Sequence, residues 1–201
     1  MPLRNRVAPW GEILARPERG TMMGNRGGRL HDEARRLGRR RWASRQWICC
    51  ELSFRGRTRE VMGPGYTELF FLDEAVALAA GHRPCFECRR AEARAFAEAW
   101  ARGLGLSAPP RAGEMDAALH ARRLAPPQVV DAEPLPAGTV IRAEGRVLLL
   151  LDAEARPWDW SGHGPARPRP RGQVEALTPP ETRAALAAGY RPRLHPSATV
   201  D

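Results

Sequence analysis

Apolar and polar side chains alternate along short stretches of the first half of the chain, and this pattern predicts β-strands. The longest such stretch is 47–54, where every second side chain is apolar. We expect the turn 55–57 to follow it and to lead into a second strand near 59–62, which together would form a β-hairpin. Shorter strands are predicted at Glu12–Ala15 and Leu69–Leu72.

Capping residues and helical periodicity predict two helices in the middle of the chain. Asp73 can cap a helix that runs through Ala80, and Gly81 suits the position after its end. A longer helix is predicted from near Cys88 to about Arg102, because apolar residues recur there at every third or fourth position.

The second half of the chain is richer in proline, and its predicted elements are shorter. Residues 103–201 hold 14 of the 19 prolines. A short helix is expected at Glu114–Leu124. Two strands are expected at Thr139–Ala143 and Arg146–Leu151, and a last helix should end at Gly189.

One short sequence occurs twice. Residues 77–84 and 185–192 are identical at seven of their eight positions, and each contains an Ala-rich segment followed by glycine. Both copies therefore predict a helix that ends at a glycine cap. A duplicated unit and a coincidence in an Ala-rich chain both explain the repeat.

Composition is typical of a folded protein without a membrane span. Hydrophobic residues make up 43% of the 201 residues, which is enough for a sizeable core. The longest aliphatic run, Val147–Leu151, is far shorter than the ~20 apolar residues that span a bilayer. With no stretch like a signal peptide at the N-terminus, we expect a soluble, cytoplasmic protein that does not associate with membranes. In that compartment four cysteines favour a metal site over disulfides.

Positive charge is concentrated in one segment. The formal net charge is +9, and all 32 basic residues are arginine. Residues 26–59, called the basic segment below, contain 11 arginines and three acidic residues. Such a concentration is typical of nucleic-acid-binding proteins, although a solvated basic face without a partner has the same composition.

Arginine and tryptophan are interleaved within the basic segment. Trp42 and Trp47 could stack on bases while the arginines contact phosphates, unless Trp47 instead packs across the hairpin. The beginning of the helix after Cys88 adds two further arginines. The candidate nucleic-acid contacts are Arg39, Arg40, Arg41, Arg45, Arg89 and Arg90.

The motif Cys85-x-x-Cys88 is the strongest chemical signal in the sequence. Two thiolates at this spacing can hold one tetrahedral zinc ion, and the N-terminus of the following helix helps to stabilise their charge. Adjacent strand residues point to opposite faces, so only one of the two hairpin cysteines should reach the ion. The candidates for the remaining ligands are Cys50, then Cys49, then His31, with His82 as a further nearby histidine.

Two other uses of these cysteines have to be weighed. A C-x-x-C pair can be a redox dithiol, but a helical segment precedes this one where a thioredoxin-like unit would have a strand. With His31 and Glu33, the motif also satisfies the H-x-E…P-C-x-x-C signature of zinc nucleobase deaminases, in which Glu33 would move the proton. The gap of 54 positions between His31 and Cys85 (85 − 31) is long for such folds.

The segment from Phe70 to Arg89 resembles the second half of the N-terminal zinc domain of the Ada DNA-repair family. The shared features are, in order, a phenylalanine pair, a short Ala-rich helix, glycine, an aromatic residue, Arg-Pro-Cys, two residues and Cys-Arg. The region 24–99 also resembles an uncharacterised bacterial family that carries this Cys-x-x-Cys unit.

The resemblance to the Ada family has several implications. It implies a DNA-binding domain in which four cysteines hold zinc, with Cys85 and Cys88 as ligands and Arg89 near the DNA. It also implies that a cysteine of the first pair accepts the methyl group of a methylated phosphate. That first pair is spaced C-x-x-x-C in the family, whereas Cys49 and Cys50 are adjacent, and we therefore expect no methyl transfer.

Together these patterns predict an α+β protein built from a zinc-stabilised β-hairpin and helix module and a small β-containing C-terminal module. The expected units are a zinc-binding module at 1–105, a helical connector at 106–128 and the C-terminal module at 129–201. We expect a structural zinc that is fully ligated by protein, and binding to nucleic acid, DNA rather than RNA. A methyl-accepting repair protein and a zinc-dependent deaminase are the alternatives, so whether the chain is an enzyme is left open.

Overall fold

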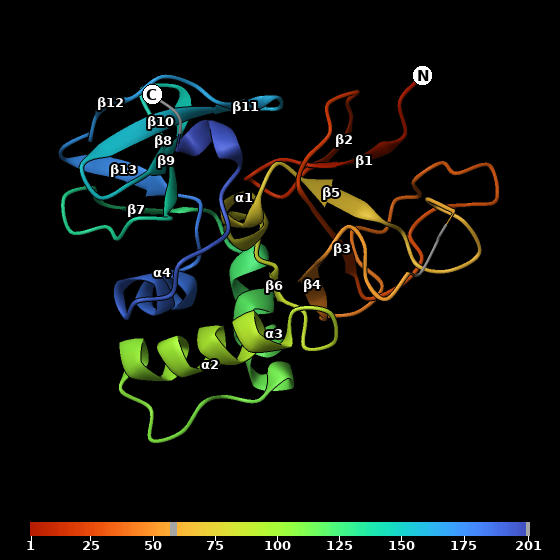
Figure 1. Ribbon diagram of the computed structural model, residues 1–201, viewed down its shortest axis with the longest axis horizontal. Coiled ribbons are helices and arrows are strands. Elements are labelled where there is room, and N and C mark those ends of the chain that lie inside the picture. Colours follow the sequence, from red (N-terminus) through yellow and green to blue (C-terminus); the bar gives the residue numbers. More distant parts are fainter. Residues whose placement is uncertain (57–59, 200–201) are drawn as a thin grey trace.

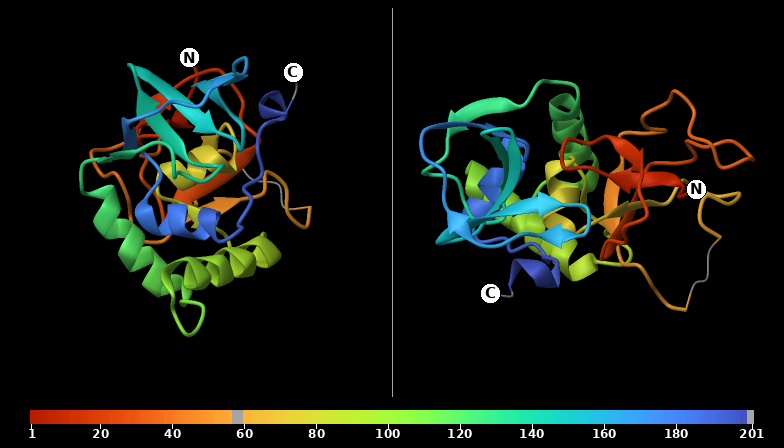
Figure 2. Two further views of the ribbon diagram at one scale, coloured as in Figure 1. Left: turned by 90° about the vertical axis from the view of Figure 1, so that its left-hand side faces the viewer. Right: turned by 90° about the horizontal axis from the view of Figure 1, so that it is seen from above.

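This computed structural model describes residues 1–56 and 60–199, which contain two β-sheets and four α-helices joined by loops (Figure 1). The predicted α+β class is confirmed. The first sheet comes from the N-terminal half of the chain and the second from the C-terminal half, and they lie at opposite ends of the molecule (Figure 2).

The first sheet has six strands in the order β2-β1-β5-β3-β4-β6. Its strands are β1 (Arg4–Val7), β2 (Ile13–Ala15), β3 (Met22–Arg26), β4 (Trp47–Cys50), β5 (Leu69–Phe71) and β6 (Arg83–Pro84). β3 pairs with β4 and β5 in antiparallel fashion, whereas β6 runs parallel to β4. The strands predicted at Glu12–Ala15 and Leu69–Leu72 are thus confirmed as β2 and β5.

The second sheet has seven strands, six of them in the order β11-β10-β9-β8-β13-β7, with β12 paired to β10. Its strands are β7 (Gln128–Asp131), β8 (Val140–Ala143), β9 (Arg146–Leu150), β10 (Glu154–Asp159), β11 (Gly162–His163), β12 (Arg167–Pro168) and β13 (Gln173–Ala176). β8 and β9 form the antiparallel pair that the sequence predicts.

Helix α1 lies between the two sheets, and the other helices lie below it in the view of Figure 1. The helices are α1 (Glu74–Ala79), α2 (Arg90–Leu104), α3 (Ala112–Arg123) and α4 (Pro180–Ala187), followed by a short 3₁₀ helix, η1 (Pro196–Ala198). Every residue of α1 is buried, and its side chains contribute to hydrophobic clusters with both sheets. α4 packs on α2 in a cluster that also contains residues of α3. Two clusters therefore join residues from both sides of position 129, and the proposed division into modules stays a prediction.

Strand β4 differs from the prediction in its length and its partners. It ends at Cys50, and the side chain of Leu52 is 52% exposed, so the apolar alternation continues beyond the sheet. Residues 60–62 form no strand, and 57–59 lie outside the described residues. The predicted hairpin was wrong because β4 pairs with sequence-distant strands, and such pairing leaves no local pattern.

The segment Asp32–Leu37 contains no helical turn. The backbone N–H of Asp32 donates to the carbonyl of Arg36, and an isolated bridge joins His31 to Leu37. Arg35 has a positive φ of 59°, which a right-handed helical turn does not allow. This part of the basic segment is therefore a tight loop between β3 and β4.

Candidate metal centre

Strand pairing brings the two cysteine-containing segments together. β6 lies beside β4 with Pro84 opposite Cys49, and the backbone N–H of Cys85 donates to the carbonyl of Cys49 at 3.0 Å. On the other side, β3 approaches β4 closely at Gly24, where a Cβ would lie 2.1 Å from the carbonyl oxygen of Ile48. The end of β4 is therefore held next to the start of the C-x-x-C turn.

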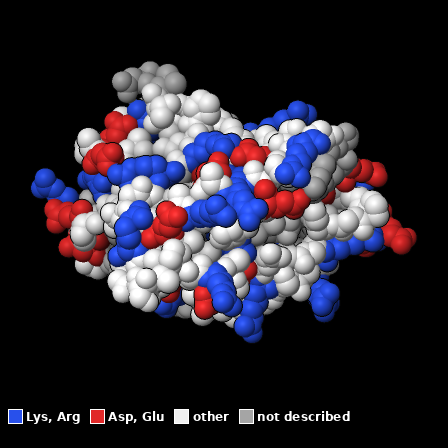
Figure 3. All heavy atoms as spheres, turned by 60° about the horizontal axis from the view of Figure 1, so that its bottom comes forward, with Lys and Arg blue, Asp and Glu red and all other residues white. Residues whose placement is uncertain are grey.

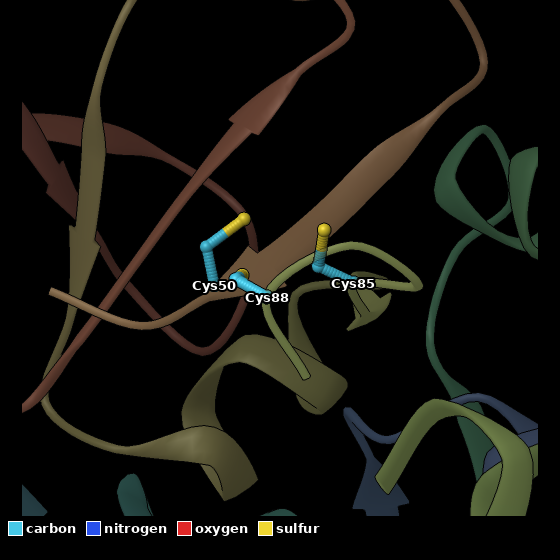
Figure 4. Close-up of side chains that lie close together, drawn as sticks. All are labelled: Cys50, Cys85 and Cys88. Carbon is cyan, nitrogen blue, oxygen red and sulfur yellow. The ribbon is translucent and has the colours of Figure 1, made fainter. Parts of the chain in front are cut away.

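The side chains of Cys50, Cys85 and Cys88 converge at this junction (Figure 4). Their three Sγ atoms all lie within 4.8 Å of one another. A tetrahedral zinc ion with Zn–S bonds of ~2.3 Å needs sulfurs about 3.8 Å apart. Within the described residues this is the one group of three or more His, Cys, Asp or Glu side chains that could hold a metal ion.

The pKa values of the three thiols are shifted in different directions. The pKa of Cys85 is far below its ordinary value because Cys50 and Cys88 hydrogen-bond to its sulfur. The pKa of Cys50 is raised because it donates to both other thiols and is buried. The contact with Cys50 lowers the pKa of Cys88, but its hydrogen bond with Cys85 and its burial outweigh this, and the net shift is upward. A metal ion would deprotonate all three groups and release protons.

The cysteines line a cavity of about 180 Å³. Aromatic side chains, Tyr66 and Phe70 among them, form part of its wall. Cys88 is half-buried, whereas Cys50 and Cys85 are buried. A metal ion held by the three sulfurs would have its remaining coordination position near this cavity.

Two carboxylates beside the thiols were not predicted as part of the site. Glu51 and Glu87 line the same cavity, and Glu51 accepts hydrogen bonds from Arg193 at 2.8 and 2.9 Å. Sequence adjacency could have indicated both, since Glu51 follows Cys50 and Glu87 stands inside the C-x-x-C motif. Three candidate ligands converge in the described chain, and no fourth His, Cys, Asp or Glu joins them as the expected closed site requires.

Cys49 and His31 lie away from this group. Cys49 is fully buried, and its Sγ accepts a hydrogen bond from Arg89 at 3.7 Å. The ring nitrogens of His31 contact Thr67 Oγ1 at 2.6 Å and the carbonyl of Gly63 at 2.9 Å. Of the two adjacent cysteines, Cys50, the first of the predicted candidates, lies with Cys85 and Cys88. His31 does not, so the ligand set of a deaminase is not brought together.

Arg89 is buried, and its expected place at a nucleic-acid surface has to be corrected. Its guanidinium pairs with the carboxylate of Glu74 at 2.8 Å, and both side chains are 1% exposed. Burial lowers the pKa of Arg89, but the carboxylate outweighs it and the pKa is raised. Buried charges require such pairing, and Arg89 therefore has a structural role here.

The other candidate arginines are exposed. Arg39, Arg40, Arg41 and Arg45 lie in the loop between β3 and β4, and Arg90 begins α2. None has a carboxylate within 4 Å among the described residues, whereas Arg36 pairs with Asp32. On the face shown in Figure 3, basic side chains are interspersed with acidic ones rather than gathered in one area. In the loop between β3 and β4, however, Arg39, Arg40, Arg41 and Arg45 have no described acidic partner.

The tryptophans of the basic segment do not offer free faces for base stacking. Trp47 is 3% exposed and packs against Trp42 and His82, with ring centroids 6.2 and 5.0 Å apart. The half-buried Trp42 packs in turn against His120 at 5.2 Å. Trp47 therefore packs within the fold, although not across the predicted hairpin, which does not form.

No family description matches this chain, and neither the curated proteins nor the solved structures include a match. Among the helices of residues 1–56 and 60–199, none combines the length and apolar character needed to cross a lipid bilayer. Fold and site together define an α+β protein with a three-cysteine group that could hold a metal ion.

Proposed function

We propose that Cys50, Cys85 and Cys88 bind one zinc ion and that the chain binds nucleic acid, DNA rather than RNA, through the basic segment. The observation that carries the zinc proposal is the convergence of three thiols from two segments. Soft thiolate ligands in a tetrahedral arrangement favour zinc over harder divalent cations. The ion would tie the end of β4 to the turn before α2, and its role is structural.

The loop between β3 and β4 supports the nucleic-acid proposal. Arg39, Arg40, Arg41 and Arg45 in this loop are exposed and have no acidic partner among the described residues, so each is available to a phosphate without breaking an ion pair. The loop segments of this half project from the side of the molecule away from the second sheet (Figure 1). The preference for DNA rests on the resemblance to the Ada family.

Methyl transfer is the second candidate function, and one observation bears on it. Cys88 is the only one of the four cysteines that is not buried in the structure. A zinc-bound thiolate is a good nucleophile only where a reactant can approach it. If a methyl acceptor existed, it would therefore be Cys88 rather than a cysteine of the first pair.

A salt titration tests the nucleic-acid proposal. Binding of fluorescein-labelled duplex and single-stranded oligonucleotides that lack terminal phosphates is followed by anisotropy between low and moderate salt. Each lost phosphate contact lowers the slope of log K against log [salt] by ~0.9 for duplex DNA. We expect the triple variant Arg39→Ala, Arg40→Ala, Arg45→Ala to bind more weakly and with a slope smaller by about 2 to 3.

The control removes the same charge from the second sheet. Arg146 and Arg167 are exposed in this sheet and Arg171 in the loop before β13, at 4.0 Å from Glu133, and their replacement by alanine changes the net charge equally. If both triple variants weaken binding to the same extent, or if the unmodified chain binds neither oligonucleotide at low salt, the basic segment is not a binding surface.

A further inference from the structure

A second group of arginines lies around Trp47, outside the cysteine site. The guanidinium carbon of Arg26 is 3.8 Å from the centroid of the indole, and that of Arg123 is 4.3 Å from it. Arg26 is 1% exposed, and Arg123 comes from the end of α3. The fold therefore brings two cations from sequence-distant elements against one aromatic ring.

Within the described residues, neither of these guanidinium groups forms an ion pair with a carboxylate. Arg26 donates to the carbonyls of Gly11 at 2.7 Å and Arg41 at 3.4 Å, and contacts the His82 ring at 3.4 Å. All of these acceptors are uncharged. In the part of the chain that the structure describes, no carboxylate lies within the 4.0 Å of an ion pair from Arg26, and two cations close to it, Arg123 and Arg41, add to the burial that lowers its pKa.

Arg123 is in a similar position. It donates to the carbonyl of Gly81 at 2.9 and 2.6 Å and to the carbonyl of Arg45 at 2.8 Å. A guanidinium has five N–H donors, so two are left after these three bonds. Burial lowers the pKa of Arg123 to about 9, although the charge of Asp116, which is itself paired with Arg83, opposes the shift. Buried arginines elsewhere in this chain are paired, as Arg83 is with Asp116 at 2.8 Å.

Arg123 borders a cavity of about 180 Å³, and Arg26 lies behind the Trp47 ring that forms part of its wall. Arg41, Arg122 and Arg123 line it together with Trp47 and Trp10, and its described lining contains no Asp or Glu. The side chain of Arg41 is exposed and has no hydrogen-bond partner within residues 1–56 and 60–199, whereas Arg122 pairs with Glu181 at 2.8 Å. The indole Nε1 of Trp47, which can only donate, is buried and also without a described partner.

We infer that this cavity binds a phosphate group, held by Arg41 and Arg123 with the positive charge of Arg26 behind them. Burying cations without a counter-ion is costly, and a phosphate dianion removes that cost while accepting several charge-assisted hydrogen bonds from guanidinium forks. Arginine suits phosphate because its donors are planar and fixed. The group could belong to a free phosphorylated metabolite or to the terminal phosphate of a nucleic-acid strand, and the chemistry of recognition is the same.

Inorganic phosphate is the first probe, measured by calorimetry on the whole chain with chloride at equal ionic strength as the reference. We expect saturable binding at one site per chain. Arg41→Gln should weaken it about tenfold, while Arg40→Gln, which alters the neighbouring arginine outside the cavity, should change it less than twofold. Arg123→Lys, which keeps the charge but loses the fork, should also weaken it.

The source of the phosphate is distinguished by a second pair of measurements. If a 5′-phosphorylated oligonucleotide binds more tightly than its unphosphorylated form, and Arg41→Gln removes the difference, the ligand is a strand end. If a nucleoside monophosphate competes with inorganic phosphate but the terminal phosphate of the oligonucleotide adds nothing, the ligand is a small molecule. Either result supports the site.

The site is overturned if phosphate shows no saturable binding, or if Arg40→Gln and Arg41→Gln have the same effect on it. This outcome is separate from the proposed nucleic-acid binding, which is tested with strands that carry no terminal phosphate. Whether phosphate binds saturably is measured on the unmodified chain, so this test does not depend on the folding of any variant.

Discussion

At the scale of single residues, the adjacent cysteines Cys49 and Cys50 have opposite surroundings. Cys49 is fully buried in the hydrophobic cluster of the first sheet, where it contacts Arg89. Cys50 lies with Cys85 and Cys88 beside a cavity. Adjacent residues on a strand point to opposite faces, so one position separates a core thiol from a candidate metal ligand.

Replacing the cysteines one at a time should separate these two roles. Cys50→Ser, Cys85→Ser and Cys88→Ser should each purify with far less than one zinc per chain, and their melting temperatures should fall because zinc binding contributes to folding. At a free zinc concentration one hundred times the Kd, binding stabilises the native state by ~2.7 kcal/mol.

Cys49→Ala is the matched control for this series. It removes a thiol from the adjacent position but leaves the three-sulfur group intact, so it should keep its zinc. Metal analysis of the purified variants checks both outcomes. If Cys49→Ala loses as much zinc as Cys85→Ser, the assignment of ligands is wrong.

No cysteine is expected to accept a methyl group at a useful rate. Cys49 is 0% and Cys50 6% exposed, so neither member of the first pair can be reached by a DNA phosphate. Intact-protein mass spectrometry after incubation with DNA carrying methylphosphotriesters should show no added methyl, and a stoichiometric gain on Cys88 would contradict this.

At the scale of elements, two helices depend on a close contact at a glycine. Gly103 lies in α2 where a Cβ would be 2.2 Å from the carbonyl oxygen of Ala184 in α4. The two helices pack together in one hydrophobic cluster, so the absent side chain sets how closely they approach. Gly113 in α3 is the opposite case, because a Cβ there would meet nothing within 4 Å.

The same substitution at these two glycines should have opposite effects. Gly103→Ala should lower the free energy of unfolding by ~1–3 kcal/mol, because backbone atoms cannot move aside cheaply. Gly113→Ala should raise it by up to ~1 kcal/mol, because alanine favours the helix and nothing opposes it. Urea unfolding of both variants checks the signs, and equal effects would show that α2 and α4 are not packed as described.

The ends of the helices were the features most readily predicted from sequence, because capping residues lie next to the ends that they mark. Asp73 caps α1 by accepting from the N–H of Val76 at 3.0 Å, and Gly81 follows its end with a φ of 80°. The repeated sequence gives a second end of the same kind, where Gly189 has a φ of 100°. In both, a backbone N–H after the glycine bonds back to the helix at 2.9 or 3.0 Å.

At the scale of the whole molecule, the two halves of the chain are joined through Glu74. Its buried carboxylate accepts hydrogen bonds from Arg89 at 2.8 Å, from the hydroxyl of Tyr190 at 2.5 Å and from the backbone N–H of Arg193 at 2.8 Å. Asp73 beside it accepts from His163 at 2.8 Å. The segment that follows α4 is thereby fixed against α1 and the beginning of α2.

Glu74→Gln should destabilise the whole chain. The change removes the buried partner of Arg89 and leaves it only the more exposed carboxylates of Glu51 at 3.5 Å and Glu92 at 3.9 Å. Breaking a buried pair costs ~3–5 kcal/mol. Glu98→Gln, on the exposed face of α2, should change stability by less than ~0.5 kcal/mol. Thermal unfolding followed by circular dichroism measures both, and a Glu74→Gln protein as stable as the original would show that this contact does not join the two halves.

The sequence supported part of the candidate site and could not support the rest. The spacing of Cys85 and Cys88 and the alternation along β4 are local patterns, and they led to the three thiols that the structure brings together. The pairing of β4 with β3 and β6, and the burial of Arg89, depend on contacts between distant segments. Charge alone could not separate an exposed arginine such as Arg39 from a buried one such as Arg26.

X-ray absorption at the zinc edge of the purified chain tests the central claim most directly. We predict about one zinc per chain with three sulfur neighbours at ~2.3 Å and one lighter atom completing a tetrahedral shell. A shell of four sulfurs would bring Cys49 into the site and contradict the structure. A chain that binds no zinc, or binds it without sulfur, would contradict the claim that Cys50, Cys85 and Cys88 form a zinc centre.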